Sequence, residues 1–192
     1  MESLLNAALQ YLSRRPRSEK EIRAYLQKKL QKRACIIAKG KDEEVLLQMR
    51  KVLSEEIEQV VSRLRELHFI DDFAFAKWWV EQRTRVKPKG WHAILFELRQ
   101  KGITQNVIDD IKEEIARGID EAKASLDAGV LAQDSARNEF SLALELAKKK
   151  MRIIGTLPRE KVYQRLGGFL GRRGFSMDTI RRVFDEVLPK SV

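Results

Sequence analysis

The chain has 192 residues, of which 43% are hydrophobic and 34% are charged, so it can form a core under a heavily solvated surface. Its single cysteine, Cys35, excludes an internal disulfide, and no apolar run is long enough to span a membrane. These features argue against a disulfide-stabilised secreted domain and against a membrane protein. We therefore expect a soluble protein of the cytoplasm.

The formal net charge of +10 is unevenly distributed along the chain. Residues 14–41 contain 11 Lys and Arg against 2 Asp and Glu, residues 145–182 contain 11 against 3, and residues 42–139 contain 15 against 20. Charged residues can solvate helix faces without positive and negative residues being separated along the chain. The separation seen here therefore favours attraction of the basic segments to phosphate. An acidic protein surface would be attracted equally well, and plain solvation remains the alternative.

Helical patterns dominate the first part of the chain. Three helices are expected there, over residues 2–13, about 19–30 and about 54–67. One face of the first helix is apolar: Leu5, Ala8, Leu9 and Leu12. Pro16 separates this helix from the second, and Ser18 followed by Glu21 predicts a capping box that opens the second helix. Residues 31–49 are an addition that the later parts of the chain lack.

The middle of the chain begins with Asp71 and Asp72, and an aspartate at this place can cap the coming helix. The expected core residues of that helix are Phe75, Ala76, Trp79 and Val80. A second helix is expected over about 91–100, and Gly102 suits the left-handed position that ends a helix. A third helix carries apolar residues at helical spacing: Val107, Ile108, Ile111 and Ile115.

After a second addition at residues 117–136, the same pattern returns. Helices are expected over about 138–152 and 159–172, with Gly174 as the counterpart of Gly102. A last helix carries Ile180, Val183, Phe184 and Val187. Across the chain, one leucine recurs every 72 residues, and we expect each copy to be buried in the second helix of its unit: Leu26, Leu98 and Leu170.

The sequence therefore predicts an all-α fold of three tandem three-helix repeats. The first repeat is expected at residues 1–68, with the basic addition at about 31–49 inside it. The second repeat is expected at residues 69–116 and the third at 137–192. Residues 117–136 between them are expected to form a linker or an extra helix.

Residues 71–83, DDFAFAKWWVEQR, resemble the signature of the RecX family: Asp-Asp, two residues, Phe-Ala, three residues, Val, two residues and Arg. Three further segments resemble other parts of that family's pattern and follow the family's order: residues 15–22 (RPRSEKEI), 90–103 (GWHAILFELRQKGI) and 170–175 (LGRRGF). The additions at about 31–49 and 117–136 depart from the pattern.

This resemblance implies a regulator of the bacterial recombinase RecA. It implies an elongated, curved array of three-helix repeats that binds in the groove of the RecA filament on DNA. There it would restrain filament growth, ATP hydrolysis and strand exchange. The expected partners are the RecA filament and single- or double-stranded DNA, bound directly or through the filament, with no membrane partner and with the chain as a monomer. No enzymatic activity, catalytic residue or cofactor is implied.

Three groups of lysines and arginines are the candidates for contact with phosphate or with an acidic partner. They are Arg15, Arg17, Lys28 and Lys29; then Arg83, Arg85, Lys87 and Lys89; then Lys148, Lys149, Lys150, Arg172, Arg173, Arg181 and Arg182. Each of them could instead be a solvated charge on a helix face. A helical-repeat module that acts directly on DNA is the alternative function, because a three-helix unit can place its third helix in a groove.

Some candidates have competing structural roles. Arg83 lies in the family motif, and an ion pair with Asp71 or Asp72 is a strong alternative to a partner contact. Trp78 and Trp79 are adjacent, so one helix face cannot bury both, and we expect one of them in the core. The two histidines have no cysteine or carboxylate cluster at metal-ligand spacing, so no metal site is expected.

Overall fold

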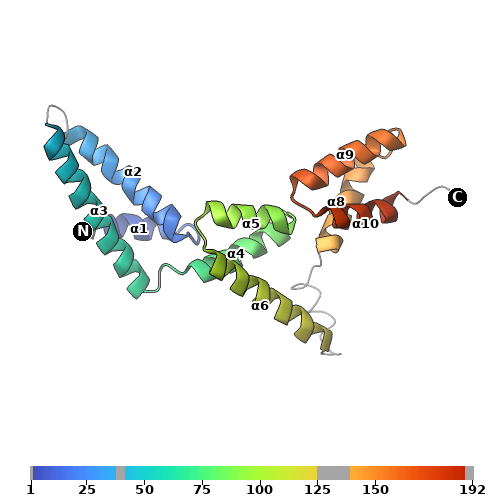
Figure 1. The fold of residues 1–192 in the computed structure, drawn as a ribbon, viewed down its shortest axis with the longest axis horizontal. Helices are drawn as coiled ribbons and strands as arrows, with labels where there is room; N and C mark the ends of the chain where they lie inside the picture. Colours follow the sequence, from blue (N-terminus) through green and yellow to red (C-terminus); the bar gives the residue numbers. More distant parts are fainter. Residues whose placement is uncertain (1, 38–41, 125–138, 189–192) are drawn as a thin grey trace. The chain divides into compact units, whose positions relative to one another are not determined.

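The structure is a computed structural model that describes residues 2–37, 42–124 and 139–188. Within these ranges all the regular elements are α-helices, which confirms the all-α prediction (Figure 1). The chain divides into two compact units. One holds the residues up to Trp78 together with Lys101–Ile103, and the other holds Trp79–Gln100 and the residues from Thr104 onward. No helix of the described ranges is long and apolar enough to cross a membrane.

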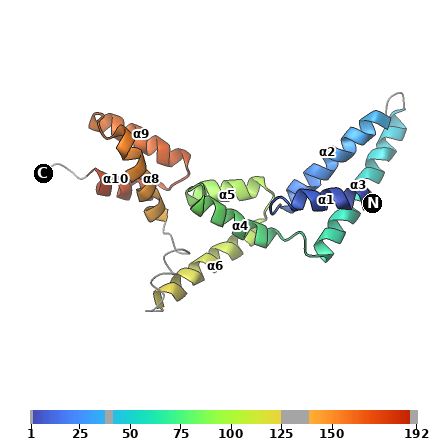
Figure 2. The same ribbon diagram turned by 180° about the vertical axis from the view of Figure 1, so that it is seen from behind.

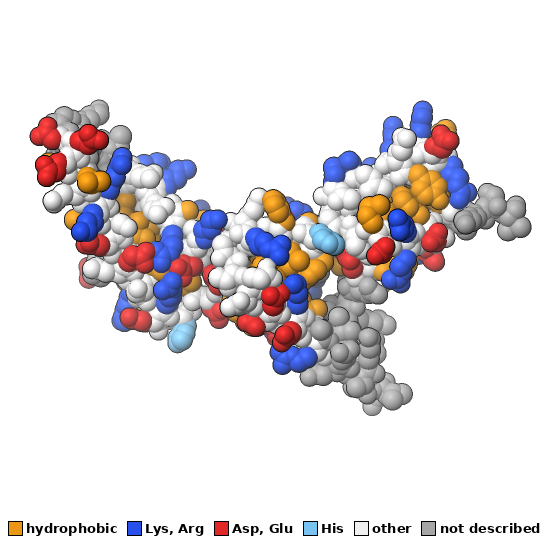
Figure 3. All heavy atoms as spheres, in the orientation of Figure 1, with side chains coloured by type: hydrophobic (Ala, Val, Ile, Leu, Met, Phe, Trp, Pro, Cys, Tyr) orange, Lys and Arg blue, Asp and Glu red, His pale blue; other side chains and the backbone are white. Residues whose placement is uncertain are grey.

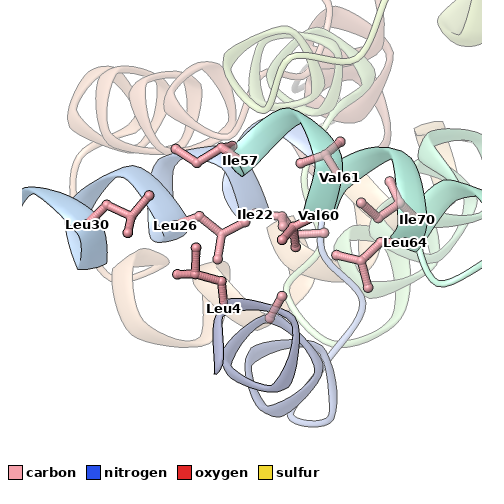
Figure 4. Packing of buried hydrophobic residues seen from close by; sticks show 10 residues of the cluster. Leu4, Ile22, Leu26, Leu30, Ile57, Val60, Val61, Leu64 and Ile70 are labelled. Carbon is pink, nitrogen blue, oxygen red and sulfur yellow. The ribbon is translucent and has the colours of Figure 1, made fainter. Parts of the chain in front are cut away.

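The first three-helix domain consists of α1 (Glu2–Leu12), α2 (Glu19–Ile37) and α3 (Glu43–Glu66). α2 and α3 form a long antiparallel pair, and α1 packs against both of them (Figure 2). Apolar residues three and four positions apart turn one face of each helix toward a shared core. The buried residues of this core are Leu4, Ala8, Ile22, Leu26, Leu30, Ile57, Val60, Val61, Leu64 and Ile70 (Figure 4).

The buried face of α1 differs from the predicted one. Leu4 and Ala7 are buried together with the predicted Ala8, although the pattern selected neither of them. The predicted leucines lie at the edge of the core, where they are only partly buried: Leu5, Leu9 and Leu12. α1 carries apolar residues around much of its circumference, so packing against α2 and α3, rather than periodicity, decides which of them face inward.

The two additions lengthen helices that were predicted to be shorter. α2 continues past residue 30 to Ile37, and α3 begins at Glu43, well before residue 54. The addition at residues 31–49 therefore extends the antiparallel pair, and residues 38–41 lie outside the described ranges. In the same way α6 (Gln105–Ala124) runs into the second addition, of which residues 125–136 are not described.

The second domain consists of α4 (Asp72–Arg85), α5 (Trp91–Gln100) and α6. Asp71 caps α4 as predicted, because its Oδ1 accepts hydrogen bonds from the N–H groups of Phe73 at 2.9 Å and Ala74 at 3.0 Å. Asp72 does something that the sequence did not predict. Its Oδ1 accepts from the N–H of Glu19 at 2.9 Å and so caps α2.

The third domain consists of α8 (Glu139–Ile154), α9 (Arg159–Arg172) and α10 (Met177–Val187), close to the predicted bounds. Ser176 caps α10 by accepting a hydrogen bond from the N–H of Thr179 at 3.2 Å. The core of the domain contains Leu142, Ala143, Ala147, Ile154, Val162, Leu166, Leu170, Phe175, Ile180 and Val183. The recurring leucines are all fully buried as predicted: Leu26, Leu98 and Leu170.

The N-terminus of α2 is contacted by the turn that follows α5. Ser18 and Glu21 form the predicted capping box, with Ser18 Oγ accepting from the Glu21 N–H at 3.3 Å and Glu21 Oε2 accepting from the Ser18 N–H at 3.4 Å. The Ser18 hydroxyl also donates to the carbonyl oxygen of Lys101 at 2.8 Å. Gly102, at φ +84°, lies so close that a Cβ on it would stand 2.8 Å from the Lys20 side chain.

The same contact recurs 72 residues further along the chain. Gly90 stands in the place of Ser18, and its N–H donates to the carbonyl oxygen of Arg173 at 2.8 Å. Gly174, at φ +79°, stands in the place of Gly102, and a Cβ on it would lie 2.4 Å from the Cβ of Ala93. Both glycines thus have the left-handed conformation that the sequence predicted. The repeat in sequence therefore corresponds to a repeated packing contact.

Candidate nucleic-acid interface

The candidate cations differ in what holds their side chains. In the middle group, Arg83 and Lys89 both bind Glu97 of α5, with Arg83 Nε donating to Glu97 Oε2 at 2.6 Å. Trp79 Nε1 donates to the same oxygen at 2.9 Å. Burial disfavours the charged form of Glu97, but the hydrogen bonds from Lys89 and Arg83 outweigh that penalty and lower its pKa. These two cations therefore share one carboxylate of their own domain, which offsets one of their two positive charges.

The ion-pair partners suggested for Arg83 were wrong. The alternative to a partner contact was an ion pair with Asp71 or Asp72, but Arg83 pairs with Glu97. Arg83 lies 11 residues beyond Asp72 on α4, which is about 16 Å along the helix and beyond the reach of an ion pair. The two aspartates instead accept backbone N–H groups at the starts of α4 and α2.

The adjacent tryptophans separate as expected. Trp79 is buried at 9% exposure, and its ring lies 4.2 Å from the Arg83 guanidinium carbon. Trp78 is half-buried, with its ring centroid 6.0 Å from that of Phe75 and 5.9 Å from the Arg15 guanidinium carbon. One tryptophan is therefore a core residue, as predicted.

In the first group, Arg15 also pairs with a carboxylate. Its Nη2 lies 2.8 Å from Glu21 Oε1, and Lys101 Nζ lies 2.7 Å from the same oxygen. Burial opposes ionisation of Glu21, but the hydrogen bonds from Arg15 and Lys101 prevail and lower its pKa. Arg15 therefore helps to hold the end of α2 rather than offering a free charge.

Arg17 and Lys29 are held in a different way, by aromatic rings. The Arg17 guanidinium carbon lies 4.0 Å from the centroid of Tyr11, and Lys29 Nζ lies 6.0 Å from the centroid of Tyr25. Neither cation makes an ion pair with any residue that the structure describes. Lys28, beside Lys29, is exposed.

Rings also hold cations in the third domain. Phe169 of α9 has Arg173 at 4.8 Å and Lys150 at 5.6 Å from its ring centroid, and Arg182 lies 4.4 Å from that of Phe140. Arg173 in addition donates from Nη1 to the carbonyl oxygen of Pro88 at 2.8 Å.

The remaining candidates are exposed. Arg181 reaches Asp178 only at 4.0 Å. The others have no ion-pair partner among the described residues: Lys28, Arg85, Lys87, Lys148, Lys149 and Arg172. Figure 3 shows Lys and Arg side chains gathered over α9 and along α2. Across residues 2–37, 42–124 and 139–188, no three His, Cys, Asp or Glu side chains form a group that could hold a metal ion.

The carboxylates and aromatic rings that hold the candidate cations were not identified from the sequence. Glu97 and Lys101 were not selected, because their ion-pair partners lie 8 to 80 residues away in sequence. Tyr25 and Lys29 lie four residues apart on α2, and this helical spacing could have indicated their contact. Tyr11 offered no such local signal, since its partners Arg17 and Tyr25 lie beyond the end of α1.

Comparison with known proteins identifies the family. Models of the first, second and third three-helix domains of RecX match residues 5–30, 71–110 and 138–184. A regulatory protein RecX of Prosthecochloris aestuarii is 34% identical over 96% of this chain and 93% of its own length. The chain belongs to the RecX family. Another regulatory protein RecX, from Cronobacter sakazakii, is 30% identical over 94% of this chain and 90% of its own length.

Solved RecX structures share the fold. RecX from Lactobacillus salivarius has a TM-score of 0.59 at 22% identity, with 97% of this chain and 95% of that chain covered. A further regulatory protein RecX has a TM-score of 0.60 at 25% identity, with 96% and 72% covered. The family and the three three-helix domains inferred from the motifs are thereby confirmed, whereas the binding roles of the candidate cations and the exact domain boundaries stay predictions.

Proposed function

We propose that this RecX-family protein binds the RecA filament on DNA and inhibits filament growth, ATP hydrolysis and strand exchange. The observation that carries the proposal is the family match in all three domains, together with a relative matched over nearly the whole chain. A match to one helical domain would support a fold, whereas the complete set in order supports the regulatory role of the family.

The distribution of charge supports a ligand that carries phosphate. Cations outnumber acidic residues in residues 14–41 and 145–182, and several of them are held by rings or are exposed rather than paired with carboxylates. A filament on DNA presents both phosphate and acidic protein surface. Such a cationic surface attracts both over roughly one Debye length, about 8 Å at physiological ionic strength.

The proposed action is binding rather than catalysis, in the cytoplasm where a recombinase acts on DNA. Glu19, Glu21 and Glu97 each accept hydrogen bonds from two cationic side chains. Burial opposes ionisation of each glutamate, but its cationic partners outweigh burial and lower its pKa. A carboxylate in this state stays charged at neutral pH and is poorly suited to donate a proton.

The test is RecA ATPase activity on single-stranded DNA, with this protein titrated into preformed filaments. We expect inhibition at substoichiometric amounts, and parallel inhibition of strand exchange. A matched variant with Lys148, Lys149 and Lys150 changed to Gln should inhibit less while its helicity is unchanged. No change in either activity at a stoichiometric excess of the unaltered protein would overturn the proposal.

A second candidate function is direct binding of DNA without the recombinase. It is favoured by the cations that lack a carboxylate partner, because each of them offers a full charge to phosphate. The comparison that separates the two functions is affinity for a bare oligonucleotide against affinity for a preformed filament on the same oligonucleotide. Salt dependence does not separate them, because both ligands carry phosphate.

A further inference from the structure

Two tyrosines of the first domain stack face to face, and each has a cation near its ring. The ring centroids of Tyr11 and Tyr25 are 4.2 Å apart, and the ring planes are inclined by 6°. Arg17 lies 4.0 Å from the ring centroid of Tyr11, and Lys29 lies 6.0 Å from that of Tyr25. α1 supplies Tyr11, α2 supplies Tyr25 and Lys29, and Arg17 belongs to the segment between these helices.

A ring fixes a cation without neutralising it. A carboxylate partner offsets part of the positive charge that it positions, as Glu21 does for Arg15 and Glu97 does for Arg83. A ring face attracts the cation through its quadrupole and leaves the net charge intact. The Nε of Arg17 is buried without a hydrogen-bond partner among the described residues, so the ring rather than a hydrogen bond at Nε holds the guanidinium.

We propose that Arg17 and Lys29, positioned by the Tyr11–Tyr25 stack, form a binding site for the phosphodiester backbone of nucleic acid. The site rests on the proposed affinity for DNA but not on the RecA filament. An arginine held against a ring face is preorganised to offer N–H donors to phosphate, and it therefore loses less side-chain entropy on binding.

The ligand chemistry is backbone phosphate rather than bases. Tyr11 has Arg17 at 4.0 Å and Tyr25 at 4.2 Å, so its ring is already engaged by a cation and by a second ring. A base would have to displace one of them in order to stack, and binding is therefore independent of base sequence.

Nucleic acid is favoured over an acidic protein by the excess of basic residues in the segment that carries Arg17 and Lys29. Residues 14–41 contain 11 basic against 2 acidic residues, and those two, Glu19 and Glu21, each pair with cationic side chains. Protein surfaces mix charges of both signs, whereas a nucleic-acid backbone is uniformly negative.

The experiment measures binding of a fluorescent oligonucleotide by anisotropy over a range of salt concentrations, with a 30-nucleotide single strand and a duplex of the same length. The main variant changes both Arg17 and Lys29 to Gln. Two lost phosphate contacts should reduce the slope of log affinity against log salt by about 1.4 on single strands and about 1.8 on duplex. The charge-matched control changes Arg50 and Lys51, exposed on α3, to Gln and should leave the slope unchanged.

The ring variants test positioning. Tyr11→Leu leaves every charge in place but removes the ring face that holds Arg17. The slope should therefore fall by the amount expected for one lost phosphate contact, about 0.7 on single strands and about 0.9 on duplex. Tyr11→Phe keeps the face and should bind like the unaltered protein. Circular dichroism reports whether each variant keeps its helicity, and the glutamine variant decides the proposal if Tyr11→Leu unfolds.

Several outcomes would overturn the site. An unchanged slope in the glutamine variant, or an equal decrease in slope in the α3 control, would show that Arg17 and Lys29 are ordinary solvated charges. A loss in Tyr11→Phe as large as that in Tyr11→Leu assigns the effect to the hydroxyl and not to the ring. Slope changes without any effect of the protein on RecA ATPase would support the site and overturn the filament proposal, so the two failures are distinguishable.

Discussion

Glu97 is the residue on which three side chains of the second domain converge. Its carboxylate accepts hydrogen bonds from Trp79, Arg83 and Lys89, and its side chain is 16% exposed. A part-buried carboxylate in this position joins α4, α5 and the segment between them. Removing it leaves two cations and an indole N–H short of an acceptor, which costs more than the loss of a surface ion pair.

Glu97→Gln should lower the free energy of unfolding at pH 7 by about 1–3 kcal/mol, since the remaining amide oxygen cannot balance both cations. Urea denaturation is the measurement. Glu66→Gln, which removes an exposed partner of Arg63, is the control and should change stability by less than about 0.5 kcal/mol. Equal effects of the two changes would contradict a structural role for Glu97.

The stabilisation by Glu97 should also depend on pH. The folded protein lowers the pKa of Glu97, so the contribution is complete above the ordinary glutamate pKa of about 4.3 and is lost as pH falls through the lower folded pKa. The difference in stability between the unaltered protein and Glu97→Gln should therefore shrink below about pH 4.3. A difference that stays constant down to pH 3 would show that the ion pairs contribute nothing.

Leu98 tests the repeat alignment at the scale of one side chain. It is completely buried on α5, so Leu98→Ala removes packed atoms and should cost about 2–5 kcal/mol. Phe96, on the same helix, is 61% exposed, and Phe96→Ala should cost less than about 0.5 kcal/mol. Thermal or urea melts of both variants check this, and a similar small loss in the two would mean that Leu98 is not a core residue.

At the scale of elements, the repeated feature is the turn that follows the second helix of a domain. Lys101 and Arg173 each offer a carbonyl oxygen to the start of an earlier helix, one to the hydroxyl of Ser18 and the other to the N–H of Gly90. The residue after each of them is a glycine with positive φ, because the chain reverses there while in close contact with the earlier helix. Each of these hydrogen bonds therefore has two effects: it pairs a polar group at the start of a helix, and it holds the turn against that helix.

Gly174→Ala should destabilise the protein by at least about 1–2 kcal/mol, because the left-handed conformation is costly for alanine and the new Cβ would lie 2.4 Å from Ala93. Gly171→Ala is the matched control. A Cβ there meets no heavy atom of the described structure within 4 Å beyond its own helix backbone, and the change should stabilise α9 by up to about 0.5–1 kcal/mol. Denaturant midpoints that shift in the same direction for both variants would contradict the proposed contact.

At the scale of the whole molecule, the question is whether the basic first and third domains bind one ligand together. One variant changes Arg17, Lys28 and Lys29 to Gln, and another changes Lys148, Lys149 and Lys150. If one filament engages both groups, the variant with all six changes should lose more binding free energy than the sum of the two separate losses, because each group holds the ligand at a high effective concentration for the other.

The measurement is affinity for a preformed RecA filament at several salt concentrations. Changes at exposed helix positions add little to stability, so circular dichroism should show an unaltered fold. Strictly additive losses would mean that the two groups bind independently. Full affinity in the six-residue variant would mean that neither group contacts the filament and that the middle domain makes the contact.

The sequence by itself determined the features that depend on local chemistry and periodicity. Ser18 and Asp71 were identified as caps, and Gly102 as a left-handed glycine, because each conformation is set by residues within one helical turn. The burial of Leu98 followed from helical spacing combined with the 72-residue repeat. These signals were sufficient for the all-α fold and for its three domains.

Only the tertiary structure decided which charges are paired. Arg83 meets Glu97 fourteen residues away, and Lys101 meets Glu21 eighty residues away, so periodicity could not select these partners. The cationic role of Arg17 likewise depends on Tyr11, which a different helix brings against it. The sequence does not distinguish a lysine or arginine that pairs with a carboxylate from one that packs on an aromatic ring. That difference arises only when distant segments pack together.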